Sequence, residues 1–484
     1  MLRPTTNLAP FQHVKTPFAH QQEVEDISWQ EEYYALFMEM GTGKSKVAID
    51  TMSLLFLNRQ IDGVLIIAPK GGYLNWIDEE IPAHIPEHIP KRMAFWNADS
   101  TKLEQRIAYS LLGAKDDCLD IMVVNVEALN GDRAYEFTET FVRSHYTLII
   151  VDESTCIKNH AAKRTKAVYK LGALSDYRRI LTGTPITDSP LDLFGQCQFL
   201  KPGVLGHDNW VSFSNYYADI QKMTHGTRRY DKIVRYKNLP ELTQRIQAFS
   251  YRKLKSECLD LPEKTFVNYY VEQTSEQKAA YKKMKEEAMI QFSNEEMVSS
   301  TSVITTMGKL HQINCGHIKD DFGNIHDIPN NRVSELIDIL SKTHDKVIIW
   351  CNFKRDVELI RNAIKKEFDE DASLYYGETT TDDRRESLEN FRRGNSRFFV
   401  STLATGAMSL TIVESAYTVY YSYDYNAMLW LQSQDRNHRP GQTRNVTYVV
   451  MQTPKSVDTR IIKALKEKED LAAQVLDNWR ELID

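Results

Sequence analysis

Short apolar runs alternate with longer polar stretches along the first part of the chain. Each run has four to six mostly aliphatic residues, a length and composition typical of buried parallel strands. The runs are Tyr34–Met38, Val64–Ala68, Ile121–Val126, Thr147–Val151 and Arg179–Thr182. The polar stretches between them suit crossover helices, so the pattern predicts a parallel sheet built from strand–helix–strand units.

A second series of apolar runs follows later in the chain. Its members are Lys346–Cys351, Ser396–Ser401, Thr418–Tyr423 and Asn445–Met451. Between the two series, roughly Leu193–Leu340, we expect a mainly helical stretch, and DLPEK (Asp260–Lys264) is the candidate linker. We therefore expect an α/β fold with two sheet-containing lobes, residues 1–255 and 256–484, and a helical insertion between the two series.

The end of the chain has apolar residues at helical spacing. They are Ile461, Leu465, Ala472, Val475, Leu476, Trp479 and Leu482. This spacing predicts an amphipathic helix that packs on the body of the protein, and a partner-binding helix is the alternative.

Composition narrows the class of protein. The chain has 484 residues, 42% hydrophobic and 26% charged, which is ordinary for a globular protein. Its net charge of −6 excludes a uniformly basic protein but leaves room for a local nucleic-acid-binding surface. No two of the six cysteines form a CxxC pair, and the chain has no apolar stretch long enough for a signal peptide or a membrane span. We therefore expect a reducing, cytoplasmic location and no membrane contact.

A candidate phosphate-binding loop, MEMGTGKSK, lies between a predicted strand and a predicted helix. Gly41 and Gly43 let the backbone wrap a phosphate, and the first amides of the helix point at it. Lys44 is expected to reach the β- and γ-phosphates, and the Ser45 hydroxyl to bind Mg²⁺. Met38 stands where the usual motif has its first glycine, so a simple glycine turn is the alternative.

Two acidic residues end the strand LIIVDEST. Asp152 is expected to hold Mg²⁺, and Glu153 to orient and deprotonate the attacking water. The strand RRILTGTP delivers small hydroxyl residues to the same edge of the sheet, either to sense phosphate or as an ordinary turn. In QSQDRNHRPGQ, Arg436 and Arg439 are candidates for stabilising the transferred phosphoryl group, and a solvated basic helix is the alternative.

These segments together resemble the Swi/Snf-type ATPases of helicase superfamily two, from about Thr16 to about Leu476. The similar segments are KTPFAHQ, MEMGTGKS, APKGGYLNWIDEE, VNVEALN, GTPITDSPLDLFGQCQFLKPGVLG, YRKLKSECLDLPEK, YVEQTSEQKAAY, VIIWCNF, YYGETT and DRNHRPGQ. The resemblance implies two tandem RecA-like lobes, each a parallel sheet flanked by helices. It also implies Mg-ATP, with Gln21, Gly41, Thr42, Gly43, Lys44, Ser45 and Gln432 at the nucleotide.

The resemblance further implies DNA contacts at Lys70, Asn125, Asn352, Thr402 and Gly406. Additional basic residues, Arg228, Arg229, Arg235, Arg384 and Arg385, either contact phosphates or line a solvated face. We expect a monomeric motor that tracks duplex DNA without sequence preference. The alternatives are a strand-separating or annealing helicase on DNA or RNA, and a nucleic-acid-binding scaffold without ATPase activity.

Three features depart from the family pattern. The acidic motif is DEST, where the family has alanine and histidine after the acid pair, so its coupling of ATP to DNA is expected to differ. The glycine-rich turn becomes GAMSLTI, with Ala407, Ser409 and Thr411 at positions of family glycines and asparagine, and Asp188 replaces an asparagine. No accessory domain flanks the two lobes, which favours a compact bacterial or phage-like member.

Overall fold

The computed structural model describes residues 10–96, 101–113, 117–225, 228–294, 300–407 and 410–476. The chain forms two compact units. Unit 1 comprises Met1–Asp219, Val234–Asp260 and Asp470–Asp484, and unit 2 comprises Ile220–Ile233 and Leu261–Glu469. The main change from one unit to the other, between Asp260 and Leu261, lies in the DLPEK segment.

Unit 1 contains a seven-stranded sheet in which every pairing is parallel, in the order β3-β4-β2-β5-β6-β1-β9. The strands are β1 (Tyr33–Met38), β2 (Gly63–Ala68), β3 (Lys91–Trp96), β4 (Leu119–Asn125), β5 (Thr147–Asp152), β6 (Tyr177–Leu181) and β9 (Ser250–Lys253). Because all the strands run the same way, their carboxyl ends share one edge of the sheet. The segments that follow β1, β5 and β6 therefore meet at that edge.

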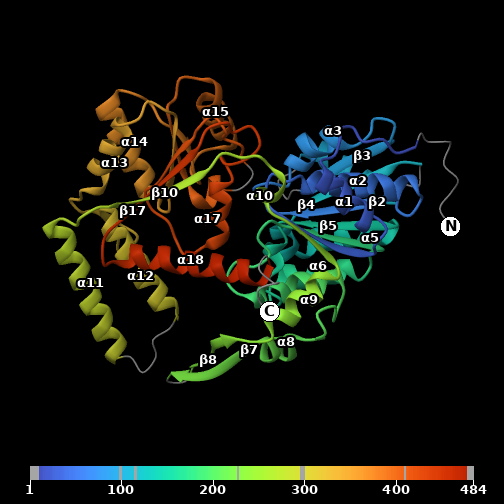
Figure 1. Ribbon diagram of the computed structural model, residues 1–484, viewed down its shortest axis with the longest axis horizontal. Helices are drawn as coiled ribbons and strands as arrows, with labels where there is room; N and C mark the ends of the chain where they lie inside the picture. Colours follow the sequence, from blue (N-terminus) through green and yellow to red (C-terminus); the bar gives the residue numbers. More distant parts are fainter. Residues whose placement is uncertain are drawn as a thin grey trace. The chain divides into compact units, whose positions relative to one another are not determined.

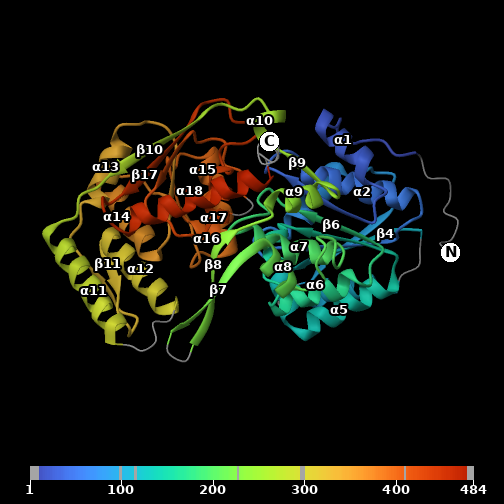
Figure 2. The same cartoon turned by 60° about the horizontal axis from the view of Figure 1, so that its bottom comes forward.

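Helices cover both faces of this sheet (Figure 2). One face packs on α1 (Ala19–Ser28), α2 (Lys44–Leu57) and α3 (Ile81–His84), and the other on α5 (Asp132–Ser144), α6 (Lys163–Gly172) and α7 (Leu193–Leu200). Unit 1 also has η1 (Trp76–Glu80), α4 (Lys102–Ser110), η2 (Val126–Asn130), η3 (Ser154–Ile157), η4 (Pro190–Asp192), α8 (Trp210–Tyr217), α9 (Leu239–Gln247) and α10 (Lys255–Cys258). Since the central strands are buried on both faces, they are almost continuously apolar.

Unit 2 contains a six-stranded parallel sheet in the order β10-β17-β16-β13-β15-β14. Its strands are β10 (Lys264–Tyr270), β13 (Val347–Cys351), β14 (Ser373–Tyr375), β15 (Phe398–Thr402), β16 (Tyr417–Tyr420) and β17 (Val446–Gln452). Figure 1 labels two of these strands, β10 and β17. Alternate residues of each central strand belong to two separate hydrophobic clusters, one on each face. Helices α13 (Arg332–Ser341) and α14 (Lys354–Phe368) cover one face, and α17 (Ala427–Gln434) and α18 (Val457–Leu476) cover the other.

The remaining elements are β7 (Ala218–His225), β8 (Arg228–Tyr236), α11 (Ser275–Asn294), α12 (Ser300–Cys315), β11 (His317–Lys319), β12 (Ile325–Asp327), α15 (Thr381–Arg393) and α16 (Leu403–Gly406). Of these, α15 and α16 contribute Phe391 and Leu403 to the hydrophobic cluster on the face that α17 and α18 cover. Strands β7 and β8 form a two-stranded sheet of their own, as do β11 and β12. In the described part of the chain, no helix is both long and apolar enough to cross a lipid bilayer.

The predicted fold class, two RecA-like lobes with parallel sheets flanked by helices, is confirmed. Two details differ from expectation. Strands β3, β9, β10 and β14 were not predicted, because each lies at or near a sheet edge and lacks a continuous apolar run. The stretch 193–340 is also less helical than expected, since β7 to β12 lie within it.

The predicted C-terminal helix is present as α18. Ile461, Leu465 and Val475 are buried, which confirms that this helix packs on the body of the protein. Trp479 and Leu482, which the pattern also assigned to the helix, lie outside the described residues.

Candidate active site

The loop between β1 and α2 has the backbone of an anion-binding cradle. Gly41 and Gly43 have φ of 83° and 92°, which favour glycine. Helix α2 begins at Lys44 and runs for 14 residues, so its free N-terminal amides lie at the loop. A Cβ on Gly43 would lie only 2.1 Å from Nε2 of Gln21. The loop is therefore closely packed against Gln21 at Gly43.

Helix α1 is the element that packs against this loop. The Gln21 side-chain amide donates to the Thr42 carbonyl at 2.9 Å, and its oxygen accepts from the Phe18 amide at 3.0 Å. His20, which sequence reasoning did not single out, contacts the same Thr42 carbonyl through Nε2 at 2.8 Å. The structure thus brings Gln21, a predicted nucleotide-binding residue, directly to the predicted phosphate loop.

The acidic pair lies at the end of β5, two strands from β1 in the sheet. Asp152 accepts a hydrogen bond from the Trp76 indole at 3.0 Å and another from the Glu153 amide at 2.9 Å. Burial raises the pKa of Asp152, while the Trp76 hydrogen bond and the charge of Lys44 oppose that rise. Lys44 itself is buried and donates to the Glu39 carbonyl at 3.3 Å. Lys44 and Asp152 are therefore close enough to interact electrostatically.

Glu153 has the left-handed backbone conformation, with φ of 45°, which is uncommon for a residue with a side chain. Its carboxylate accepts from the Thr182 hydroxyl at 3.2 Å. The same hydroxyl accepts from the Thr184 amide at 3.1 Å. The segment Gly183–Pro185, which follows β6, is thus joined to the predicted catalytic acid. This is expected for a segment at the shared edge of the sheet. Backbone strain of this kind is common at functional sites.

In the acidic motif DEST, the residue that replaces the family's alanine, Ser154, forms a hydrogen bond of its own. Ser154 is buried, and its hydroxyl donates to Gln196 of α7 at 2.7 Å. Gln196 in turn donates to the Pro185 carbonyl at 2.6 Å. The end of β5 is therefore linked to the GTPITDSP segment through α7. Asp188, the other substituted position, forms an ion pair with Lys158.

These residues fit Mg-ATP. The glycine loop and helix N-terminus provide amide donors, and Lys44 provides a cation for phosphate oxygens. The Ser45 hydroxyl in the first turn of α2 and the Asp152 carboxylate are oxygen ligands of the kind Mg²⁺ prefers. The donor set therefore matches the nucleotide that the resemblance implies.

In unit 2, the predicted arginine segment follows α17 and is held firmly by its own unit. Arg436 is 1% exposed and donates to the carbonyls of Gln432 and Leu410, at 2.8 and 2.9 Å. Arg439 is more exposed and donates to the Leu410 carbonyl at 3.4 Å. Gln432 is buried, and its side-chain oxygen has no hydrogen-bond partner among the described residues. The two arginines therefore differ: Arg436 is integrated into the fold, and Arg439 lies nearer the surface.

The predicted DNA-contact residues of unit 1 lie at the shared edge of its sheet. Asn125 ends β4 beside Ala68, which ends β2, and Lys70 follows two residues later. Lys70 is exposed, and its amide donates to Glu127 at 3.1 Å. Asn125 is mostly buried and caps the next turn by accepting from the Ala128 amide at 2.8 Å. The Lys70 side chain is thus the more accessible of the two.

The predicted contacts of unit 2 occupy the corresponding edge of the second sheet. Thr402 ends β15 beside Cys351 of β13, and Asn352 follows immediately. The Asn352 amide donates to Ser422 at 2.6 Å, and Thr402 donates to Thr405 at 3.0 Å. Gly406 has a packing role, because a Cβ there would lie 2.2 Å from Oγ of Ser401.

The glycine-rich turn that departs from the family pattern is only partly described. Ala407 is fully buried, and the carbonyl of Thr411 accepts two hydrogen bonds from the Arg392 guanidinium. Met408 and Ser409 lie outside the described residues.

The additional basic residues are dispersed. Arg235 forms an ion pair with Asp219, and Arg384 lies over the Tyr375 ring at 5.6 Å. Arg385 is exposed, and the side chains of Arg228 and Arg229 lie outside the described part. These five residues therefore do not form one compact cluster through the contacts that the structure describes.

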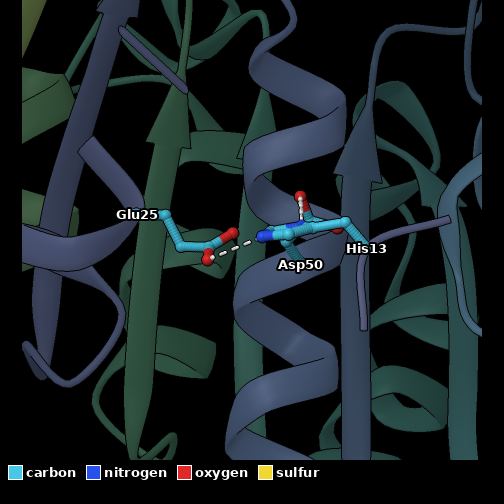
Figure 3. A group of neighbouring side chains, drawn as sticks. All are labelled: His13, Glu25 and Asp50. Carbon is cyan, nitrogen blue, oxygen red and sulfur yellow. Dashed lines mark ion pairs between the residues drawn. The ribbon is translucent and has the colours of Figure 1, made fainter. Parts of the chain in front are cut away.

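A buried charged cluster ties α1 to α2 beside the nucleotide loop (Figure 3). His13 lies between two carboxylates, with Nε2 3.5 Å from Glu25 and Nδ1 3.3 Å from Asp50. Lys46 forms an ion pair with Asp50. Because the two ring nitrogens face different carboxylates and a lysine already neutralises Asp50, the cluster is built as an ion-pair network rather than as a set of ligands converging on one metal.

Burial raises the pKa of Glu25 to about 7. The charges of Asp50 and Asp26 raise it further, and Lys46 and a hydrogen bond from Gln22 lower it. The cluster was not predicted from the sequence. In the sequence, the cluster is indicated only by the positions of its acids. The helical period places these acids of α1 and α2 on the faces that point toward the sheet.

Comparison with known proteins assigns the family. Residues 30–318 match the SNF2-related domain, and residues 331–441 match the helicase conserved C-terminal domain. The first match alone covers more than half of the chain. The chain therefore belongs to the SNF2-related family of helicase-like ATPases, as the sequence motifs predicted.

Similar proteins come from distant organisms. The ISWI chromatin-remodeling complex ATPase ISW1 of Saccharomyces cerevisiae is 26% identical over 91% of this chain and 38% of its own length. The putative ATP-dependent helicase/translocase YwqA of Bacillus subtilis is 23% identical over 91% of this chain and 46% of its own length. The chain thus spans less than half the length of these curated relatives.

A solved structure of the SWI2/SNF2 ATPase core of Sulfolobus solfataricus in complex with dsDNA also matches. It is 22% identical, with a TM-score of 0.42, and the match covers 97% of this chain and 95% of that chain.

Proposed function

We propose that the protein is a DNA-stimulated ATPase that translocates along the backbone of duplex DNA without sequence preference. One observation carries this proposal. The phosphate loop after β1, the acid pair at the end of β5 and the threonines after β6 meet at one sheet edge, where Thr182 contacts Glu153 and Lys44 interacts with Asp152. The translocase activity named for the Bacillus subtilis relative supports it.

In this proposal, the loop amides and Lys44 bind the β- and γ-phosphates, Gln21 reads the adenine, and Gln432 contacts the nucleotide. Ser45 and Asp152 would hold Mg²⁺, which when bound neutralises phosphate charge. Glu153 orients the attacking water and accepts its proton, and Thr182 fixes that carboxylate.

We assign Arg436 and Arg439 to the stabilisation of charge on the transferred phosphoryl group. The buried hydrogen bonds of Arg436 give it a second, structural role, since two backbone carbonyls depend on it. Arg439 donates a longer bond of 3.4 Å to the Leu410 carbonyl, so we expect loss of this arginine to affect chemistry more than stability.

On the DNA side, we propose that Lys70, Asn125, Asn352, Thr402 and Gly406 mark the strand-contacting edges of the two lobes. We propose residues 1–255 and 256–484 as the two lobes, acting as a monomer in the cytoplasm. Backbone contacts carry little information about base sequence, which is why we expect tolerance of sequence.

The test is steady-state ATP hydrolysis by the protein alone and with duplex DNA, single-stranded DNA or duplex RNA. We expect strong stimulation by duplex DNA, and loss of turnover in Lys44→Ala and Glu153→Gln. Lys283→Ala, a change at a lysine whose side chain is 77% exposed, is the matched control and should hydrolyse normally.

Stimulation of hydrolysis only by single-stranded DNA or RNA would refute the duplex translocase and favour a strand-separating helicase. Firm DNA binding with no turnover on any nucleic acid would refute the motor and leave a scaffold.

A further inference from the structure

Three buried polar side chains of unit 2 form a hydrogen-bonded network at the carboxyl edge of its sheet. They come from separate elements: His317 from β11, Asp356 from the first turn of α14, and Ser422 from the segment after β16. His317 is 2% exposed, and Asp356 and Ser422 are fully buried. A buried carboxylate is costly unless donors satisfy its oxygens, so the position of Asp356 depends on the residues around it.

The Asp356 carboxylate is the centre of this network. Because a carboxylate only accepts hydrogen bonds, Nε2 of His317 donates to its Oδ1, at 2.8 Å. The Ser422 hydroxyl donates to the other oxygen, Oδ2. In a catalytic triad the imidazole stands between the acid and the hydroxyl, whereas here the acid stands between the other two. The arrangement therefore does not activate Ser422 as a nucleophile.

The network ends on the turn that follows β13. The Ser422 oxygen accepts a hydrogen bond from the backbone amide of Asn352 at 2.6 Å. The ring of Phe353, the next residue, meets the His317 ring edge to face, with centroids 5.4 Å apart. Two consecutive residues of this turn are thus held by opposite ends of one buried network.

A simpler role exists for the carboxylate. An acid in the first turn of a helix stabilises the positive end of the helix dipole, and Asp356 occupies that turn of α14. This role does not require the bond from the Asn352 amide to Ser422, which extends the network to a residue of the candidate DNA edge. The two roles predict different effects when the Ser422 hydroxyl alone is removed.

We propose that this buried network positions the Asn352 side chain for its contact with DNA. The proposal rests on the proposed function, in which Asn352 meets the backbone of the duplex. Ser422 fixes the Asn352 amide, and Asp356 and His317 fix the direction of the Ser422 hydroxyl. A side chain that is already held in its binding geometry loses less conformational freedom when DNA binds. The network acts through Asn352 and takes no part in ATP chemistry.

The first test compares S422A with S415A. Ser415 is also fully buried, and its hydroxyl donates to the Lys346 carbonyl at 2.7 Å, just before β13 begins. Both substitutions remove a buried hydroxyl beside the same sheet, but S415A does so at the edge opposite to Asn352. S422A should raise the duplex DNA concentration for half-maximal stimulation of ATP hydrolysis about 3- to 10-fold, the effect of one lost hydrogen bond. S415A should leave that concentration unchanged.

The maximal rates separate positioning from general damage. For both serine variants, hydrolysis without DNA and hydrolysis at saturating DNA should remain close to the wild-type rates. Thermal melting of the two proteins should show similar losses of stability, since each loses one buried hydroxyl.

The carboxylate is tested by D356A and its conservative counterpart D356N. D356A should raise the half-maximal DNA concentration at least as far as S422A does. In D356N the amide oxygen can accept from Ser422, and the amide nitrogen can donate to Nε2 of neutral His317. D356N should therefore keep more of the wild-type DNA response than D356A. If D356A fails to fold, the comparison of the two serine variants still decides the question.

A double-mutant cycle with N352A tests whether Ser422 acts through Asn352. N352A keeps the backbone amide but removes the side chain that the network presents. S422A should therefore add little to the DNA response once that side chain is absent, so the two effects should not be additive.

Two results would overturn the proposal while leaving DNA-stimulated hydrolysis intact. One is an equal DNA response of S422A and S415A, and the other is full additivity of S422A and N352A. Failure of duplex DNA to stimulate the wild-type protein would instead refute the proposed function itself.

Discussion

Substitution of Gly43 by alanine should distort the nucleotide loop in two separable ways. The first is backbone strain, because φ at this residue is 92° and a Cβ in left-handed conformations costs about 1–2 kcal/mol. The second is steric, because the new Cβ would lie 2.1 Å from Nε2 of Gln21. Gln21 must then move and lose its bonds to Thr42 and Phe18, each contributing about 0.5–1.5 kcal/mol.

A double-mutant cycle separates the two effects. We expect G43A to lower the unfolding free energy by about 2–5 kcal/mol in the wild-type background. In the Q21A background the steric part is absent, so the same substitution should cost only about 1–2 kcal/mol. Urea unfolding of the four proteins, followed by circular dichroism, gives the stabilities. Calorimetric titration with ATP shows whether nucleotide affinity follows the same coupling.

The cycle also defines what would refute this reasoning. If the two substitutions are additive, Gln21 does not hold the loop through Gly43, and the close contact has no energetic meaning. If G43A is as stable as the wild type, the loop does not require a left-handed residue at that position. Alanine at Gly113 is the control for strain without contact, because φ there is 80° and a new Cβ would meet no atom within 4 Å.

Further expectations concern other parts of the site. R439Q should reduce kcat by about a thousandfold or more, with little change in thermal stability. R436Q should reduce kcat and also lower the unfolding free energy by about 2–4 kcal/mol, because it loses two buried hydrogen bonds. Equal melting temperatures of the two variants would contradict this difference. W76F, which removes the indole donor to Asp152, should raise the Mg²⁺ concentration for half-maximal hydrolysis about 10- to 100-fold, and unchanged Mg²⁺ dependence would argue against it. Folded Glu25 has a pKa of about 7 against an ordinary 4.5, so the folded state binds more protons between these values. The stability of the wild type relative to E25Q should therefore fall as pH rises from 5 to 8, and parallel curves would exclude the effect.

The sequence was most informative where burial is complete. The central strands of both sheets are apolar on both faces, so their apolar runs located them to within a few residues. The edge strands escaped prediction because half of their surface is polar. Strand β3 begins with Lys91 and Arg92, and β10 is exposed along most of its length. Their strand conformation comes from pairing with a neighbour, which a local pattern does not contain.

The two-stranded sheet of β7 and β8 shows the same limit in another form. The segment from Arg228 is dense in charge and lies within the stretch that was expected to be mainly helical. A half-buried strand is recognised by apolar residues at every second position. The sequence of β8 lacks this pattern, because both of its faces are exposed at Ile233 and Val234.

In the candidate site, functional residues were predictable where they lie together in one contiguous motif. The glycine loop, the acid pair and the arginine segment are each contiguous in sequence. The contacts that join segments were not predictable. Trp76 reaches Asp152 across 76 positions, and Ser154 reaches Gln196 across 42. Such pairings follow from the order of strands in the sheet, which no single motif encodes.

The position of β9 in the first sheet has a consequence for how the chain folds during its synthesis. Strand β9 (Ser250–Lys253) pairs with β1 (Tyr33–Met38), so the edge of β1 has no partner until the ribosome has added more than 200 further residues. At about 5–20 residues per second, that interval is on the order of 10 to 40 seconds. Through that time β1 presents an apolar, unpaired strand edge, the kind of surface on which nascent chains associate. We therefore expect slower elongation or a stop codon before Ser250 to yield aggregated protein, and the same first half to become soluble once β9 is present.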